Sequence, residues 1–355
     1  MTVRRSLRAA AVSSVRTLVS ERYFQRLRHL YARLTIHRKL RRADRLANRR
    51  GDPTRPCLYA VSEAGVPHAY WYFLEWLAEH DSELHSRIWL NHLPGRMPEH
   101  ATVMHAWVQD PVLERDATVF SAVSALETEI LARGGAVLQP VRVLSHSMRT
   151  ELEKRLSAVG LRTPRTVIID PHTSEPFGGL QPPFVVRKEW GHFVPMHLCR
   201  TFAEAERLLR LATDTAETLV ASEYIETVSP DGLYRKYRYL MTGPRGMARH
   251  MIASPNWEVR PADRVLNAVL AEEELAFVNA PCSLHDVFDD ARRRLEFDIA
   301  AFDYSFDSTG NPVVWEVNPF PDLSMPSAER APHLKDTGLK TFVLLAAYYR
   351  EALSA

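Results

Sequence analysis

The stretch from residue 302 to 319 constrains the fold most, because it has the pattern of a β-hairpin that presents two carboxylates. Two arms rich in β-branched and aromatic residues flank a turn-forming segment, Asp307 to Asn311. Pairing of the arms about the middle of this turn places Asp303 nearly opposite Glu316. Like charges that face each other across paired strands are destabilising unless a cation joins them. We therefore expect the hairpin to hold a cation between Asp303 and Glu316.

Mg²⁺, with Mn²⁺ as its substitute, suits such a hairpin. Mg²⁺ takes one or two protein carboxylates, and the phosphates of a bound substrate complete its octahedron. Asn318 follows Glu316 by two residues, so it points to the same face of the strand and offers a neutral oxygen. We expect Asp303, Glu316 and Asn318 to be the metal ligands. The alternative is an exposed hairpin that carries its acidic residues by chance.

The charge of the chain is distributed unevenly. Residues 1–50 contain 15 Lys and Arg and two acids, Glu21 and Asp44, a charge of +13 that leaves −11 for the other 305 residues. Apolar residues recur there at three- and four-residue steps, which predicts a basic helical leader. Three roles stay open for this leader: packing on the body of the protein, contact with an anionic membrane surface, or contact with a protein partner. Nucleic-acid binding is not expected, because no recognised module accompanies the basic residues.

Three cysteines, Cys57, Cys199 and Cys282, are few, far apart and odd in number. They predict a reducing compartment without a disulfide framework, and none has the spacing of a zinc ligand. The sequence has no run of ~18 apolar residues that would span a membrane. We therefore expect a cytoplasmic protein.

Strands and helices alternate between residues 57 and 145, which predicts a small, mostly parallel α/β domain. The expected strands there are 57–61, 87–90, 101–108 and 136–139, and the expected helices are 68–80 and 117–133. Further along, we expect strands at 165–169, 184–188, 193–199, 218–225, 234–242 and 247–254, and helices at 147–159, 202–212, 262–279, 284–296 and 340–353. Ser147 and Thr201 are the predicted N-caps of the first two of these helices. Pro195 restricts the strand at 193–199 to a sheet edge.

Basic residues occur at the end of one predicted strand and along another. Arg187 and Lys188 end an apolar strand and precede a turn that contains Gly191, a place where cations can hold the oxygens of a nucleotide triphosphate. Lys236 and Arg238 share one face of a later strand. Taken alone, each of these features is also typical of a solvated surface.

Taken together and in this order, the segments resemble the ATP-grasp superfamily over about residues 136–325. The pattern Asp303…Glu316-Val317-Asn318-Pro319 matches the family's carboxylate–Asn metal signature, and Ser222-Glu223-Tyr224-Ile225 resembles the hinge strand that binds adenine. The resemblance implies a mixed α/β and α+β architecture, the ATP-grasp fold, in which two α+β subdomains clasp ATP. The expected order is the leader 1–50, the parallel α/β domain 57–145, and an ATP-grasp domain 146–355 divided into 146–216 and 217–355.

The resemblance also assigns residues to the nucleotide. Arg187 and Arg149 fall where the family usually has phosphate-binding lysines, unless Lys188 takes one of these roles. Arg238 resembles an arginine that contacts the terminal phosphate in glutathione-synthetase-like and RimK-like members, so we expect Arg238 and Arg187 to be catalytic. The glycine-rich loop is reduced to Gly191. The expected nucleotide-binding set is Arg149, Arg187, Lys188, Glu223, Tyr224, Ile225, Glu226 and Arg238, with Glu226 or Asp231 as the ribose-binding acid.

The activity that the resemblance implies is an ATP-dependent carboxylate–amine ligase. It would form an amide through an acyl phosphate, release ADP and phosphate, and act on small-molecule or peptide carboxylates and amines; similar proteins are often homodimers. Arg249 and His250 are candidates to face the acceptor substrate. Three alternatives stay open: a small-molecule kinase on the same fold, a non-catalytic ATP-binding scaffold or regulator, and a protein whose main role is anionic-surface binding through its leader.

Overall fold

The computed structural model describes residues 55–63, 70–191, 195–212, 218–323, 325 and 331–355. The expected basic leader at residues 1–50 lies outside this part of the chain. Within the described residues, no helix combines the length and the apolar character needed to cross a membrane.

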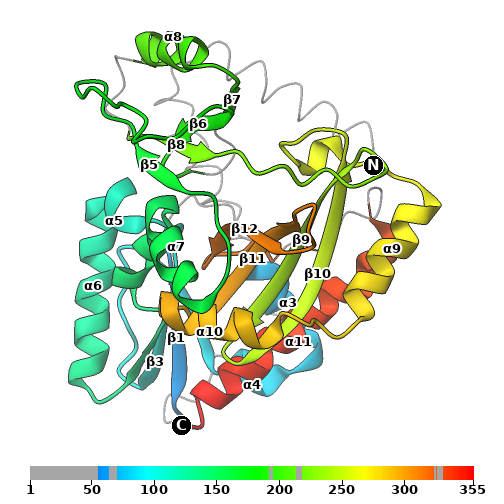
Figure 1. Ribbon diagram of the computed structural model, residues 1–355. Coiled ribbons are helices and arrows are strands. Elements are labelled where there is room, and N and C mark those ends of the chain that lie inside the picture. The colour runs from blue at the N-terminus through cyan, green and yellow to red at the C-terminus, as the bar shows by residue number, and fades with distance from the viewer. Residues whose placement is uncertain (1–54, 64–69, 192–194, 213–217, 324, 326–330) are drawn as a thin grey trace, which may run out of the picture.

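The first sheet is parallel, as the alternation of strands and helices predicts (Figure 1). Its strands lie in the order β2-β1-β3-β4, with the bounds β1 Cys57–Ser62, β2 Ile88–His92, β3 Ala101–Trp107 and β4 Ala136–Leu138. Helix α6 (Ala117–Ala132) packs on one face of this sheet. Helix α3 (Tyr70–His80) packs on the other face, and the short helices α4 (Ser82–Ser86) and α5 (Val112–Arg115) occupy connections.

The second sheet is antiparallel and contains the hairpin at 302–319. Its order is β10-β9-β11-β12, with β9 Tyr234–Thr242, β10 Arg245–Ser254, β11 Ile299–Phe306 and β12 Pro312–Asn318. Because side chains alternate between the faces of a strand, β9 and β11 contribute side chains to two hydrophobic cores. Phe302 packs under helix α10 (His285–Leu295), and Ala301 packs under helix α11 (Lys335–Ala352).

The first two sheets share one hydrophobic core. Helix α11 lies between them, and its Phe342 and Tyr349 join Leu58 of β1, Phe73 of α3 and Ile299 of β11 in a single buried cluster. The hydroxyl of Tyr349 also lies 2.6 Å from His105 Nδ1 and accepts a hydrogen bond of 3.1 Å from Tyr70. The domain at 57–145 and the sheet that carries the hairpin therefore form one body.

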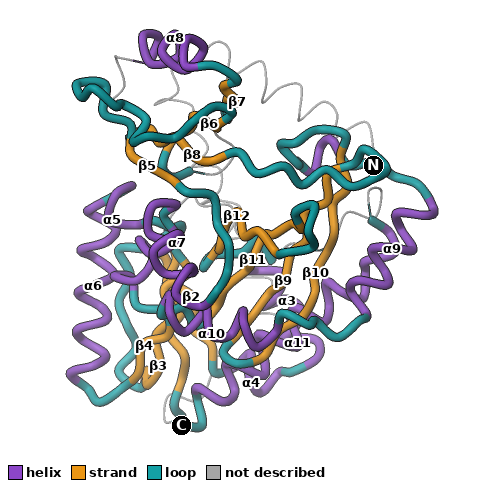
Figure 2. Tube along the Cα trace, in the orientation of Figure 1, coloured by secondary structure: helices purple, strands orange, loops and turns teal. Residues whose placement is uncertain are grey.

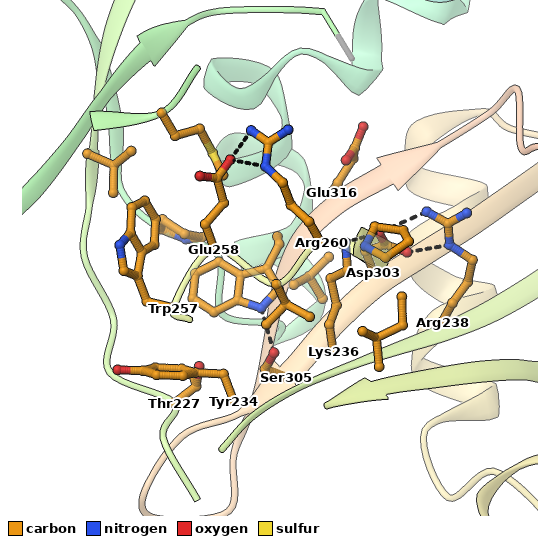
Figure 3. A pocket seen from close by; sticks show the side chains of 18 of the residues that line it. Thr227, Tyr234, Lys236, Arg238, Trp257, Glu258, Arg260, Asp303, Ser305 and Glu316 are labelled. Carbon is orange, nitrogen blue, oxygen red and sulfur yellow. Dashed lines mark hydrogen bonds and ion pairs between the residues drawn. The ribbon is translucent and has the colours of Figure 1, made fainter. Parts of the chain in front are cut away.

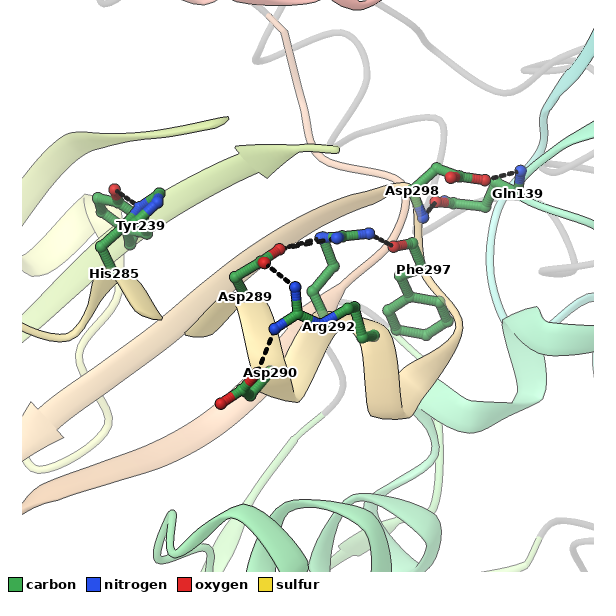
Figure 4. Close-up of polar contacts among 9 residues, drawn as sticks. Gln139, Tyr239, His285, Asp289, Asp290, Arg292, Phe297 and Asp298 are labelled. Atoms are coloured by element: carbon green, nitrogen blue, oxygen red, sulfur yellow. Dashed lines mark hydrogen bonds and ion pairs between the residues drawn. The ribbon is translucent and has the colours of Figure 1, made fainter. Parts of the chain in front are cut away.

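A buried glutamine reinforces this junction. Gln139 is 1% exposed and has φ +54°. Its side-chain oxygen accepts hydrogen bonds from Asp298 N (3.0 Å) and Ile299 N (2.7 Å), and its amide donates to Pro319 O (2.5 Å). Its backbone N–H donates to the Asp298 carboxylate (Figure 4). One residue after β4 thus fixes the start of β11 and the end of β12.

The third sheet is small and has its own core. Its order is β5-β8-β6-β7, with β5 Thr166–Ile168, β6 Phe184–Lys188, β7 His197–Cys199 and β8 Leu219–Glu223. Helix α8 (Phe202–Ala212) belongs to this unit, which is drawn at the top of Figures 1 and 2. The expected subdomain boundary between residues 216 and 217 would place β8 in the C-terminal subdomain. In the structure, β8 is a central strand of this third sheet. The edge position of β7, which follows Pro195, agrees with the prediction.

Several predicted helices differ from the structure at their ends, and the helix expected at 340–353 begins five residues earlier, at Lys335 of α11. In place of the helix expected at 147–159, the structure has α7 (Arg149–Leu156). A 3₁₀ helix (Val141–Ser147) precedes α7, and a second 3₁₀ turn (Ser157–Val159) follows it. Ser147 is not its N-cap, because Ser147 Oγ donates to Leu144 O and Met148 occupies the cap position. The helix expected at 262–279 begins only at α9 (Ala268–Asn279), where Asn267 caps Leu270 N. The Thr201 cap of α8 is confirmed by its hydrogen bond from Glu204 N.

Candidate functional site

A cavity of about 600 Å³ lies between the second and third sheets. The third sheet contributes Val185, Arg187 and Ser222, and the second sheet contributes the polar ends of β9, β10 and β11 with the bulged part of β12. Seven cationic side chains of the described residues line it, against five carboxylates. The cations are Arg149, Arg187, Lys236, Arg238, Arg249, Arg260 and Arg264, and the acids are Glu223, Glu258, Asp303, Glu316 and Asp322. The excess of positive charge suits an anionic ligand.

The hairpin brings its two carboxylates together as predicted. Asp303 on β11 is directly opposite Glu316 on β12, and both line the cavity. A bulge follows this pair, because Tyr304 is opposite Val314 and Trp315 is the additional residue. On its other side Asp303 is opposite Arg238 of β9. Bulges commonly re-aim side chains beside active sites, and here the bulged Trp315 also lines the cavity.

Asp303 is held as a carboxylate by two cations. Arg238 donates to it through Nε (2.5 Å) and Nη2 (2.8 Å), and Lys236 Nζ lies 3.2 Å from its Oδ2 (Figure 3). Burial raises the pKa of Asp303, but the charges of Arg238 and Lys236 outweigh burial and hold it below the usual range of an aspartate. Asp303 is therefore ionised at neutral pH, the state that a metal ligand needs.

These residues fit a hard divalent cation. Asp303 and Glu316 supply carboxylate oxygens, the donors that Mg²⁺ prefers, and each oxygen has more than one lone pair. Asn318 is buried, lies outside the cavity lining, and its Oδ1 accepts a hydrogen bond from Phe320 N (2.8 Å). Within the described ranges, no cluster of three His, Cys, Asp or Glu side chains could hold a metal ion. A cation here would thus depend on two carboxylates, one amide oxygen and the oxygens of a bound ligand.

Two arginines line the cavity near the end of β6. Arg149 begins α7 and donates through Nη1 to Glu189 O (2.6 Å), while Thr150 N and Oγ1 donate to the Glu189 carboxylate (3.1 and 2.7 Å). Burial and the charge of Arg149 lower the pKa of Arg187 to about 9. The Nε atoms of both arginines are buried, with no hydrogen-bond partner among the described atoms. Paired cations with unused donors fit the oxygens of a phosphate.

The predicted hinge lies at the apolar end of the cavity. Glu223, Tyr224 and Ile225 line it together with Leu152, Val185 and Val314. The Glu223 carboxylate accepts hydrogen bonds from Arg162 Nη2 (3.1 Å) and Arg165 N (3.2 Å). Residues after β8 have left the strand, so the expected strand end at 225 is two residues too long. Glu223 N donates to Arg165 O (2.8 Å), so a flat heterocycle would use backbone groups of the residues that follow Glu223.

Three of the expected site residues lie outside the cavity lining: Lys188, Glu226 and Asn318. Glu226 Oε1 accepts from Thr227 N (3.0 Å) and Val228 N (3.1 Å), and its Oε2 accepts from Tyr224 (3.1 Å), so Glu226 fixes the turn after the hinge. The structure brings the other eight together: Arg149, Arg187, Glu223, Tyr224, Ile225, Arg238, Asp303 and Glu316.

Several lining residues are additional to the expected nucleotide and metal sites, and two of them, Arg249 and His250, are the candidates for contact with the acceptor substrate. Arg249 and His250 both line the cavity because the register of β10 shifts between Ala248 and His250, which makes Arg249 a bulged residue. Burial and Arg238 lower the pKa of Arg249 to about 10, and burial followed by these two arginines lowers the pKa of His250 well below its usual range. The other additions, Trp257 to Pro261, come from the connection after β10. The sequence has no periodic signal for a bulge or for an irregular connection.

Comparison of the sequence with protein-family models and with curated proteins gives no match. Solved structures do match. A D-alanine–D-alanine ligase from Bacillus anthracis complexed with ATP is 14% identical, with a TM-score of 0.52 over 84% of this chain and 97% of that one. The ATP-grasp ligase PsnB, complexed with minimal precursor, Mg and ADP, is 14% identical, with a TM-score of 0.52 over 84% and 99% of the two chains.

D-cycloserine synthetase DcsG is also similar, at 16% identity and a TM-score of 0.52, over 82% of this chain and 99% of that synthetase. At these identities the likeness concerns the fold. The chain has an ATP-grasp fold, in agreement with the sequence resemblance.

Proposed function

We propose that this protein is an ATP-dependent carboxylate–amine ligase. The observation that carries the proposal is that Asp303 lies opposite Glu316 in a cavity that Arg149 and Arg187 also line. Carboxylates that hold a cation and arginines that hold phosphates are the two requirements for binding a nucleoside triphosphate. The ATP-grasp fold and the ligase activity of similar proteins support the same function.

ATP would lie along the cavity with its base at the hinge. The apolar residues near Ile225 would contact adenine, and the backbone of residues 224–225 would bind its edge. The phosphates would extend toward Arg149 and Arg187. Asp303, Glu316 and the amide oxygen of Asn318 would hold Mg²⁺, which when bound neutralises charge on the phosphates.

The reaction would proceed in two displacements. An oxygen of the substrate carboxylate attacks the γ-phosphorus, and the bond to the β–γ bridging oxygen breaks, so that ADP leaves and an acyl phosphate forms. The lone pair of an uncharged amine then attacks the acyl carbon; the C–O bond to phosphate breaks, phosphate leaves, and the amine nitrogen loses one proton. Arg238 and Arg249 lie where they can stabilise charge on these oxygens.

One observation favours a second candidate function, a kinase for a small anionic molecule. The cations Arg249, Arg260 and Arg264 supply the additional basic surface that a phosphorylated or carboxylated acceptor needs. The two functions differ in the fate of the phosphoryl group. A ligase releases inorganic phosphate only when both a carboxylate and an amine are present, whereas a kinase transfers the phosphoryl group to one acceptor.

The test is calorimetric titration of the protein with ATP in the presence of Mg²⁺, for the wild type, Glu316→Ala and Glu351→Ala. Glu351 is an exposed control that pairs with Arg245 away from the cavity. We expect metal-dependent binding by the wild type and the control, and its loss in Glu316→Ala. Release of ADP and phosphate over a panel of carboxylates and amines then separates ligase from kinase. Absence of ATP binding by the wild type would contradict the proposal.

A further inference from the structure

The connection between β10 and α9 contributes a whole segment to the cavity wall. Trp257, Glu258, Val259, Arg260 and Pro261 all line the cavity. This segment follows the last residue of β10 in the second sheet. It is therefore a source of ligand contacts in addition to those of the hinge and of the two arginines Arg149 and Arg187.

Both ends of the segment are fixed. At its start, Asn256 N donates to Ser254 Oγ (3.1 Å), and Ser254 is fully buried. At its end, Val265 N donates to Ala253 O (2.9 Å), and Arg264 pairs with the buried carboxylate of Glu274. The residues between these anchors consequently have a defined place over the cavity.

The middle of the segment reaches the hinge and the phosphate wall. The ring of Trp257 meets that of Tyr224 edge to face, with centroids 6.0 Å apart. In Figure 3 the side chains of Glu258 and Arg260 project between Trp257 and Glu316. The charges of both act on Arg187: burial and Arg149 lower its pKa, Glu316 and Glu258 oppose this, and Arg260 adds to the lowering. The segment thus lies close enough to the phosphate wall to contribute charge there.

Arg260 is paired with a carboxylate of its own segment. Its Nε donates to Glu258 Oε1 (2.6 Å), and its Nη2 donates to the same oxygen. Both side chains are half-buried, so the pair is screened only partly by solvent. A triphosphate in the cavity would repel Glu258 and attract Arg260, and its oxygens offer the same hydrogen-bond acceptors as the carboxylate.

We propose that Arg260 is a further phosphate-binding residue of this site, and that Glu258 occupies its guanidinium until the phosphates of ATP displace the carboxylate. This inference rests on the proposed function, because it assumes that the cavity takes a nucleoside triphosphate. It adds a cation from the connection after β10 to Arg149 at the start of α7 and Arg187 on β6, so that three different segments contact the phosphates.

The experiment is calorimetric titration with ATP and Mg²⁺ of the wild type, Arg260→Gln, Glu258→Gln and the double variant. Arg260→Gln should weaken binding by about 10- to 100-fold, the range for loss of a charge-assisted hydrogen bond. Glu258→Gln should tighten binding by about 3- to 10-fold, because a competing anion is removed. In the Arg260→Gln background, Glu258→Gln should tighten binding less than it does in the wild type, since part of its effect is exerted through Arg260.

Two controls keep the outcome interpretable. Arg245→Gln removes an exposed arginine, likewise paired with a glutamate, outside the cavity, and should leave the affinity unchanged. Arg260→Lys should retain most of the affinity, and thermal unfolding of each variant reports whether it folds. Wild-type affinity in a folded Arg260→Gln overturns the inference and leaves the proposed function standing. Weaker ATP binding by Glu258→Gln also overturns it. An Arg260→Gln variant whose ATP affinity is unchanged but whose KM for the amine substrate is raised overturns it as well. Absence of ATP binding by the wild type overturns both proposals.

Discussion

Arg187 carries a charge that the cavity without nucleotide stabilises poorly. Burial and Arg149 lower its pKa to about 9, and the nearby carboxylates compensate only in part. Arg187→Met should therefore raise the free energy of unfolding of the nucleotide-free protein by about 1 kcal/mol, as replacement of buried charges by apolar side chains often does. The same substitution should weaken binding of ATP with Mg²⁺ by roughly 100-fold.

Chemical denaturation and calorimetry measure the two effects of Arg187→Met separately. Arg200→Met, at an exposed position of the third sheet's unit, is the matched control and should change neither quantity appreciably. A loss of stability together with unchanged ATP affinity would show that Arg187 is a structural residue.

Glu127 predicts a dependence of stability on pH. It lies on α6, is 9% exposed, and accepts a hydrogen bond from Val141 N (2.6 Å). Burial raises its pKa from 4.5 to about 7. The folded state therefore binds the proton more tightly than the unfolded state. The stability that Glu127 contributes is complete below pH ~4.5 and is lost as the pH rises through ~7.

Glu127→Gln should remove this loss. Relative to the wild type, the variant should gain up to about 3 kcal/mol in free energy of unfolding between pH 4.5 and pH 8. Denaturant titrations over this range measure the difference. Glu129→Gln on the same helix removes an exposed carboxylate that pairs with Arg133 and should show no such change. Parallel curves for the wild type and Glu127→Gln would contradict the assignment.

At the scale of elements, Gln139 joins β4 to the hairpin strands. It makes four hydrogen bonds to residues 298, 299 and 319 while almost fully buried. Gln139→Ala keeps the backbone N–H that donates to Asp298 but removes the three side-chain bonds, so Asp298 N, Ile299 N and Pro319 O lose their partner and the free energy of unfolding should fall by about 2–4 kcal/mol. Denaturant unfolding measures this fall, and Gln181→Ala, at an exposed position, should lie within about 0.5 kcal/mol of the wild type. An equally small effect at residue 139 would mean that water replaces these bonds.

The sequence predicts elements well where local chemistry decides them. The hairpin at 302–319 has alternating side chains and a turn, and the structure pairs Asp303 with Glu316 as expected. The sequence does not predict the late start of α9, because residues 262–279 have a helical pattern throughout. Asn267, which caps the helix, lies within that range. The Ser147 cap was wrong because Ser147 ends a preceding 3₁₀ helix.

The site was predictable to the extent that family motifs mark it. Arg187 and Arg238 are on the expected strands and line the cavity. Arg249 could not be placed with the same assurance, since its inward orientation depends on a shift of strand register, which is a property of the pair β9–β10 and not of one strand. Glu258 and Arg260 lie in an irregular connection whose position is set by anchors at 253–256 and 264–265. Their role depends on tertiary contacts that local sequence does not encode.

At the scale of the whole molecule, the three sheets divide into two bodies. The first two sheets share a core around α11, whereas the third sheet buries Phe177, Phe184 and Ala221 in a core of its own. The cavity lies where the two bodies meet, and Arg162 bridges them through Glu223 (3.1 Å) and Asp307 (3.2 Å). A ligand that contacts both walls therefore stabilises the arrangement of the two bodies.

The shared core also determines the order in which the chain can fold. Helix α11, Lys335–Ala352, follows every other described element, yet its Tyr349 packs against Tyr70 and Phe73, more than 270 residues earlier. Before α11 is synthesised, the face of the first sheet that α3 covers lacks the contacts of Phe342 and Tyr349. The contacts between α11 and the domain at 57–145 have a high sequence separation, which slows folding. The shared core is consequently complete only when α11 has joined it, and apolar surface of the early sheet is exposed until then.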